Sequence, residues 1–190
     1  MKKGTLYVVS GPAGVGKGTV LKRAMEELSN IRYSVSCTTR APRPGLDVEG
    51  VTYHFISEEE FKSRIDAGDF LEYAHVHGHL YGTRKDIVAS ALESGTDILL
   101  EIDVVGAMNV KRMIPEAVTV FIKPPSFEEL ARRLKGRGSE SEAEQALRLK
   151  NARGELERAG EYDYIIVNDT VERAACEFIK IVRSHREAAL

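Results

Sequence analysis

The stretch that decides the fold is GPAGVGKGT, at residues 11–19. It follows the apolar run 5–9 and opens a helical pattern over 17–28, which is the setting of a phosphate-binding loop. Glycines let backbone N–H groups turn around an anion, the helix N-terminus adds its dipole, and Lys17 supplies a positive charge for the β- and γ-phosphates. The sequence therefore predicts a nucleoside triphosphate on this loop: Gly11, Pro12, Ala13, Gly14, Val15, Gly16, Lys17, Gly18 and Thr19.

The loop departs from its common form at the metal position. Gly18 stands where Ser or Thr usually offers a hydroxyl to Mg²⁺, and Thr19 follows one residue later. Asp103 follows the apolar run 98–102, and acidic groups at the carboxyl end of a parallel strand face the ligand crevice. We expect Mg²⁺ near Thr19 and Asp103, bound directly or through water. A helix N-cap is the alternative role for Asp103.

Composition limits the class of protein. The chain has 190 residues, enough for one domain with its own core. Its 27 Lys and Arg against 29 Asp and Glu leave a net charge of −2, which argues against general binding to nucleic acid or membrane surfaces. The two cysteines, Cys37 and Cys176, have no metal-ligand spacing around them and indicate free thiols in a reducing compartment. With no apolar run long enough for a signal peptide or membrane span, we expect a cytoplasmic protein.

Short β-branched runs alternate with helical patterns, which predicts an α/β fold with a parallel sheet. The predicted strands are 5–9, 33–36, 98–102, 118–122 and 164–167. The predicted helices are 17–28, 58–67, 85–93, 104–113, 127–134, 140–159 and 171–187. Ser57 and Ser126 each precede a Glu by three residues and predict helix caps. Segments 37–56 and 70–82 break the alternation and predict a small β-rich insertion.

Residues 36–43, SCTTRAPR, predict a second anion site. Arg40 and Arg43 lie among three hydroxyl side chains, and guanidinium forks match phosphate oxygens. A solvated basic loop is the alternative for this segment.

Glu72, on a predicted strand beside aromatic residues, is a candidate for reading a base. A carboxylate can accept hydrogen bonds from N1–H and N2–H₂ of guanine, a pair of donors that adenine lacks. Ser36 and Thr83 are hydroxyls that can add contacts to the same base. An exposed strand residue is the alternative for Glu72.

A polar segment over 132–145 predicts a basic lid. Arg132, Arg133, Lys135 and Arg137 fall within six residues, and Arg148 follows on the next predicted helix. Cations that converge on a transferred phosphoryl group stabilise its charge, and a closed lid excludes water. A helix surface balanced by nearby glutamates is the alternative. Asn168, at the end of the last predicted strand, can offer an amide to an adenine edge or belong to a turn.

The motifs together resemble those of the guanylate kinase family over essentially the whole chain. The segments that carry the resemblance, in order, are GPAGVGKGT, SVSCTTRAPRPG, GVTYHFIS, FLEYAHVHGHLYGT, LLEIDVVGA, RLKGRG and YDYIIVND. The resemblance implies one domain, 1–190, with a P-loop three-layer parallel-sheet core (1–35, 96–125 and 160–190). It also implies a β-rich GMP-binding insertion (36–95) and a helical lid (126–159).

The resemblance implies transfer of the γ-phosphoryl group of ATP to GMP, and to dGMP, giving ADP and GDP in purine nucleotide metabolism and GMP recycling. It implies Mg²⁺ as the cofactor and nucleotides as the partners, without nucleic acid or membrane; the oligomeric state is left open. The alternatives are a kinase for another monophosphate, a P-loop enzyme that hydrolyses its nucleotide, and a catalytically dead module that binds proteins. Lys17, Arg137 and Arg148 are present, which favours an enzyme over the module.

The resemblance also implies a role for each motif residue. It places the GMP phosphate on Arg40, Arg43, Tyr53 and Tyr81, and the guanine on Ser36, Glu72, Thr83 and Asp103. It places ATP on residues 11–19, Arg137 and Asn168. The implied catalytic residues are Lys17, Arg40, Asp103, Arg137 and Arg148. The link from Arg43 to Tyr53 is one residue longer than the usual form, so residues 46–48 fall where the chain departs from the family.

Overall fold

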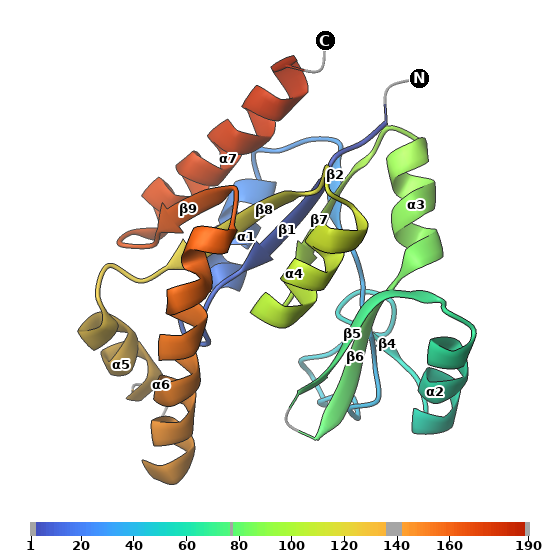
Figure 1. Cartoon of the computed structure of the whole chain (residues 1–190), viewed down its shortest axis with the longest axis horizontal. Helices are drawn as coiled ribbons and strands as arrows, with labels where there is room; N and C mark the ends of the chain where they lie inside the picture. Colours follow the sequence, from blue (N-terminus) through green and yellow to red (C-terminus); the bar gives the residue numbers. More distant parts are fainter. Residues whose placement is uncertain (1–2, 77, 136–141, 189–190) are drawn as a thin grey trace.

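The computed structural model describes residues 3–76, 78–135 and 142–188 (Figure 1). Its centre is a five-stranded sheet in the order β2-β7-β1-β8-β9, and every neighbouring pair is parallel. The strands are β1 (Leu6–Ser10), β2 (Ile31–Tyr33), β7 (Asp97–Glu101), β8 (Val118–Lys123) and β9 (Tyr164–Val167). The predicted α/β class with a parallel sheet is confirmed.

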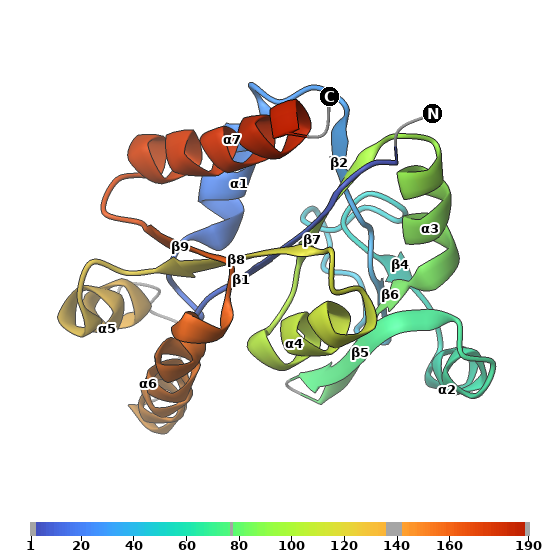
Figure 2. The same cartoon turned by 45° about the horizontal axis from the view of Figure 1, so that its top comes forward.

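Helices cover both faces of this sheet and bury alternate residues of β1. α1 (Lys17–Met25) and α7 (Val171–Ala188) pack on the face that carries Tyr7 and Val9. α3 (Lys85–Glu93) and α4 (Val104–Met113) pack on the face that carries Leu6 and Val8. Figure 2 shows α1 and α7 on one side of the sheet and α4 on the other. Because a strand covered on both faces is apolar throughout, β1 reads as a continuous hydrophobic run.

A second, four-stranded sheet forms the predicted β-rich insertion. Its order is β4-β3-β6-β5, with β5 and β6 paired as an antiparallel hairpin. The elements are β3 (Cys37–Thr38), β4 (His54–Phe55), α2 (Glu58–Asp66), β5 (Phe70–Val76) and β6 (His79–Arg84). The rings of Phe61 and Phe70 stack with centroids 4.5 Å apart, and with Cys37 they form a small separate core. The Ser57 hydroxyl accepts the Glu60 N–H at 3.0 Å, so the predicted cap of α2 is confirmed.

Two more helices, α5 (Phe127–Lys135) and α6 (Glu142–Glu157), lie at the lower left in Figure 1, across from the insertion at the lower right. The Ser126 hydroxyl accepts the Glu129 N–H at 3.1 Å, which confirms the second predicted cap. Leu130 and Leu134 of α5 and Ala152 of α6 are buried in the core on the α1 side. A 3₁₀ turn (Arg158–Glu161) leads from α6 to β9. Among the helices that the structure describes, none is long and apolar enough to cross a membrane.

The largest error in the predicted elements concerns the second strand. The sequence predicts it at 33–36, whereas β2 ends at Tyr33. The Ser34 N–H still donates to the Leu99 carbonyl, but the Ser36 carbonyl already accepts the His54 N–H of the second sheet. The chain therefore crosses from one sheet to the other within these residues. The helix predicted over 17–28 also ends earlier, at Met25.

Candidate active site

The loop that follows β1 is shaped by close backbone approaches. A Cβ at Gly11 would lie 2.1 Å from the Ile122 carbonyl oxygen, so only glycine fits there. Gly16 precedes α1 with φ of +91°, a conformation that glycine adopts without strain. The Lys17 Nζ donates to the carbonyl oxygens of Gly11 at 2.6 Å and Pro12 at 3.3 Å. The ammonium group therefore lies over the loop, where a bound phosphate would meet it.

Asn168 supports this loop from inside the protein. It is buried, and its Nδ2 donates to the Val15 carbonyl oxygen at 2.7 Å. Arg133 donates to the Val15 and Asn168 carbonyl oxygens at 3.3 and 3.2 Å, and Glu129 orients it through an ion pair of 2.8 Å. The hydrogen bonds from two arginines lower the pKa of Glu129 to about 2. The Asn168 amide nitrogen thus holds the loop in shape, whereas the resemblance implies a contact with adenine; that contact stays a prediction.

A cleft of about 400 Å³ opens beside the loop, at the carboxyl ends of β1 and β7. It brings together seven side chains that the sequence analysis selects from distant segments: Ala13, Lys17, Ser36, Tyr53, Glu72, Tyr81 and Asp103. Glu101 and Glu155 also line it. The carboxyl edge of a parallel sheet is where α/β proteins bind ligands, so this cleft is the candidate active site.

Glu72 lies on β5 of the second sheet and is buried, so the alternative of an exposed strand residue is wrong. Only 7% of it is accessible, and its Oε1 accepts the Thr83 hydroxyl at 2.6 Å. Burial raises the pKa of the Glu72 carboxyl to about 7; the hydrogen bond from Thr83 opposes this shift, and the charge of Asp103 adds to it. A Cβ at Gly106 would lie 2.8 Å from Glu72 Oε2, so the glycine leaves room for this carboxyl. The sequence analysis missed Gly106, since its role appears only when α4 packs against β5.

Asp103 both caps the N-terminus of α4 and lines the cleft. Its Oδ1 accepts the N–H groups of Val105 at 2.8 Å and Gly106 at 3.0 Å, which confirms the N-cap alternative. A Cβ at Gly106 would lie 3.4 Å from Asp103 Oδ2 as well as against Glu72, so the two carboxyl groups are neighbours. A role for Asp103 with nucleotide is compatible with the cap and stays a prediction.

Glu101 and Glu155 are acids of the cleft that the sequence analysis did not select. Glu101 ends β7, and its carboxylate lies 3.7 Å from where a Cβ on Gly18 would stand. The sequence pattern that selected Asp103, an acid at the end of an apolar strand, also applies to Glu101. Loss of solvent raises the pKa of both carboxyls, and the charge of Lys17 opposes the rise in each. Glu155 gave no signal because it is one of several acids on a polar helix.

The predicted anion site also assembles around Arg40. The Arg40 guanidinium lies 5.5 Å from the centre of the Tyr53 ring and 5.8 Å from that of Phe55. The rings of Tyr53 and Tyr81 are 5.7 Å apart, edge to face. Arg43 joins Arg40 through a shared carboxylate, that of Asp47. The two arginines and two tyrosines named from the sequence thus lie at one place.

The predicted lid is only partly described. Arg137 lies outside the described residues, and Arg148 is half-buried on α6, apart from the residues that line the cleft. Arg132 belongs to α5 and pairs with Glu129, as Arg133 does. Arg133, one cation of the segment predicted to form a lid, therefore contacts the phosphate loop, and the lid itself stays a prediction.

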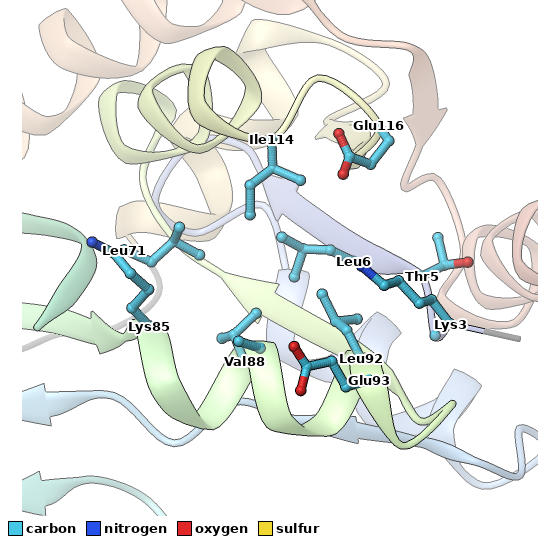
Figure 3. A pocket seen from close by; sticks show the side chains of 12 residues that line it. Lys3, Thr5, Leu6, Leu71, Lys85, Val88, Leu92, Glu93, Ile114 and Glu116 are labelled. Atoms are coloured by element: carbon cyan, nitrogen blue, oxygen red, sulfur yellow. The ribbon is translucent and has the colours of Figure 1, made fainter. Parts of the chain in front are cut away.

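A separate cavity of about 330 Å³ lies at the other end of β1 (Figure 3). Figure 3 shows Leu6, Val88 and Ile114 around it, with Lys85 and Glu116 further out. It includes no part of the phosphate loop or of the Arg40 site. Of these two cavities, which have similar volumes, it is the cleft that is lined by residues selected from the sequence.

A glycine-rich loop with a lysine at the carboxyl edge of a parallel sheet, together with a second sheet that carries paired arginines and a buried carboxyl, indicates the class of P-loop phosphotransferases. Residues 3–185 match the family model described as guanylate kinase. Guanylate kinase from Thermotoga maritima is 46% identical over 184 residues, covering 97% of this chain and 88% of the relative. Guanylate kinase from Caldanaerobacter subterraneus is 50% identical over 173 residues, covering 91% and 84%.

Guanylate kinase from Anaplasma phagocytophilum has a solved structure that superposes with a TM-score of 0.79 at 35% identity, covering 97% of this chain and 87% of the other. The chain belongs to the guanylate kinase family. It is an enzyme, a nucleotide-binding kinase of the transferase class.

Proposed function

We propose that the chain transfers the γ-phosphoryl group of ATP to the phosphate of GMP, giving ADP and GDP. The observation that carries the proposal is the buried Glu72, paired with Thr83, in the same cleft as Lys17 of the phosphate loop. An ionised carboxylate accepts two hydrogen bonds from the N1–H and N2–H₂ edge of guanine, and the buried acceptor would stay unmatched with adenine. No contact assigned here requires the 2′-hydroxyl, so dGMP is proposed as a second acceptor.

The donor ATP would bind residues 11–19, with Lys17 at its terminal phosphates. Asn168 and Arg133 keep the Val15 carbonyl oxygen engaged, so the loop N–H groups remain available for phosphate oxygens. This preorganisation lets the loop neutralise charge without rearranging during the reaction.

We propose Mg²⁺ as the divalent ion, bound together with ATP. Among residues 3–76, 78–135 and 142–188 no group of three His, Cys, Asp or Glu side chains could hold a metal, so a resident protein cage does not fit. The Thr19 hydroxyl and the carboxylates of Glu101 and Asp103 are hard oxygen donors, which suit Mg²⁺ that keeps its waters and its phosphate ligands. The bound ion supplies positive charge to the phosphates.

The acceptor phosphate would be held by Arg40, Arg43, Tyr53 and Tyr81. A GMP phosphate is already largely ionised near neutral pH, so its oxygen can attack without a strong general base. Catalysis is then positioning of the two phosphates plus neutralisation of their charge by Lys17 and Arg40. Residues 126–159 are proposed to form a lid. Arg137 and Arg148 would add positive charge at the phosphates from this lid, and the closed lid would exclude water. The proposed core comprises residues 1–35, 96–125 and 160–190, and the proposed GMP-binding region comprises residues 36–95.

The test is ADP release measured with ATP and Mg²⁺ and with GMP, dGMP, AMP, UMP or no acceptor. We expect rapid turnover with GMP and dGMP only. Faster turnover with AMP or UMP would show a kinase for another monophosphate. Equal ADP release without an acceptor would show a hydrolase, and GMP binding without turnover would show a binding module; each of these results contradicts the proposal.

A further inference from the structure

Asp47 lies in the link from Arg43 to Tyr53, and its side chain is enclosed although the loop around it is exposed. Its carboxylate is 1% accessible, whereas Leu46 and Val48 on either side are 67% and 56% accessible. An acid enclosed in this way needs partners that compensate for the lost solvent.

Those partners are the two arginines proposed to bind the acceptor phosphate. Asp47 Oδ2 forms an ion pair with Arg40 Nη1 at 2.9 Å and accepts from Arg43 Nε at 3.1 Å, while Oδ1 accepts from Arg43 Nη2 at 3.1 Å. These hydrogen bonds hold the pKa of Asp47 well below its usual range, so the carboxylate stays charged near neutral pH. One anion thus bridges two guanidinium groups.

The carboxylate is also fixed by the backbone. The Arg43 N–H donates to Asp47 Oδ2 at 2.7 Å, and the N–H groups of Leu46 and Asp47 both donate to the Arg43 carbonyl oxygen at 3.1 Å. Residues 43–47 therefore form a closed turn, and the carboxylate cannot swing away without losing the hydrogen bond from the Arg43 N–H. A carboxylate held in this way is suited to remain in place when a ligand arrives.

The bridge has a clear electrostatic effect. Two neighbouring guanidinium groups repel each other, and Arg43 is 60% accessible, so solvent would otherwise draw it away from Arg40. Each guanidinium has five N–H donors in a rigid fork, and Asp47 engages only some of them. Both arginines therefore keep N–H donors for a second anion, and Asp47 sets the orientation of their guanidinium groups.

We propose that Asp47 is a positioning residue for the acceptor phosphate: it holds the guanidinium groups of Arg40 and Arg43 together so that both bind one phosphate. The inference rests on the proposed function, because it takes these arginines as ligands of the GMP phosphate. If Asp47 were instead an internal anion that competes with the phosphate, its removal would make GMP bind more tightly.

The experiment compares the binding of GMP and of guanosine, which lacks the phosphate, by calorimetry. For Asp47→Asn we expect the GMP dissociation constant to rise about tenfold, as for other residues that orient a ligand's direct partners, and the guanosine constant to stay within about twofold. Glu49→Gln is the matched control. Glu49 lies in the same loop and bonds His54 Nδ1 and the Phe55 N–H, but contacts neither arginine. Glu49→Gln should change the dissociation constants of GMP and guanosine by the same factor.

A second measurement asks whether Asp47 acts through the arginines. With Arg40 and Arg43 both replaced by Met, adding Asp47→Asn should leave GMP binding unchanged, because the coupling between the sites has been removed. Tighter GMP binding by Asp47→Asn, or equal loss of GMP and guanosine binding, would overturn the inference. If the unmodified protein binds GMP no better than guanosine, the acceptor-phosphate site itself is wrong, which is a separate failure of the proposed function.

Discussion

Replacing Glu72 with Gln should make the protein more stable and at the same time a poorer enzyme. Burial raises the pKa of this carboxyl from its usual 4.5 to about 7. Since one pKa unit corresponds to about 1.4 kcal/mol, the ionised side chain destabilises the folded state by about 3 kcal/mol. Gln keeps an oxygen that can accept the Thr83 hydroxyl and has no charge to bury.

The pH dependence of this effect has a definite sign. The folded protein binds the Glu72 proton more tightly than the unfolded chain does, so this group's stabilising contribution is complete below pH 4.5 and is lost as pH rises to about 7. The free energy of unfolding of Glu72→Gln, minus that of the unmodified protein, should therefore increase by about 3 kcal/mol between pH 4.5 and pH 8. Comparing the two proteins at each pH cancels most contributions from other groups.

Urea unfolding at several pH values between 4.5 and 8 measures the difference. Glu59→Gln, which changes an exposed glutamate of α2 outside the cleft, is the control for removal of a carboxylate from the surface. A difference for Glu72→Gln that does not change with pH would refute the reasoning about burial.

The same variant tests the proposed role of Glu72 in reading guanine. With one acceptor replaced by a donor, kcat/KM for GMP should fall about a hundredfold, whereas KM for ATP should change little. In the unmodified protein, GMP affinity should increase as pH rises through about 7, because the ionised carboxyl is the acceptor. An unchanged KM for GMP in Glu72→Gln would remove Glu72 from the base site.

Three further predictions address the loop, the metal and the space around Glu72. Lys17→Met should lower kcat by about a thousandfold or more while the circular dichroism spectrum is kept, and normal turnover would exclude Lys17 from the chemistry. Removal of divalent ions with EDTA should abolish ADP release, and Mg²⁺ should restore it; turnover that persists in EDTA would contradict a metal-nucleotide substrate. Gly106→Ala should raise KM for GMP several-fold, since its Cβ would lie 2.8 Å from Glu72 Oε2 and the carboxyl would have to move. An unchanged KM for GMP would show that the cleft accommodates the methyl group.

The sequence predicted the fold well where the pattern is local. Buried parallel strands appear as continuous apolar runs, and the caps at Ser57 and Ser126 depend on residues three positions apart, so both could be found without a structure. The end of β2 could not, because it depends on where the chain leaves one sheet for another. That is a contact between the Ser36 carbonyl and His54, which are far apart in sequence.

The same limit applies to the candidate site. Lys17, Arg40 and Glu72 stand in compact motifs whose chemistry is visible in the sequence. Asp47 and Gly106 matter only through what the fold brings against them: two arginines around one carboxylate, and a neighbouring carboxyl against α4.

Arg133 shows what local charge leaves undecided. It lies in the basic segment that predicted a lid, which stays a prediction, but Leu134 is buried in the core and brings α5 beside Gly14 of the phosphate loop. Arg133 consequently bonds the Val15 carbonyl oxygen. The position of Arg133 in the sequence did not reveal that its side chain contacts the phosphate loop.

The most direct test of the central claim follows the phosphoryl group itself. ATP labelled with ³²P at the γ-position is mixed with the enzyme, Mg²⁺ and GMP, and the products are separated at an early time. The two-site arrangement of the cleft predicts that the label appears in the β-phosphate of GDP in step with ADP formation. Label released as inorganic phosphate at the same rate with or without GMP would contradict the account, because water and not the nucleotide at Arg40 and Glu72 would then be the acceptor.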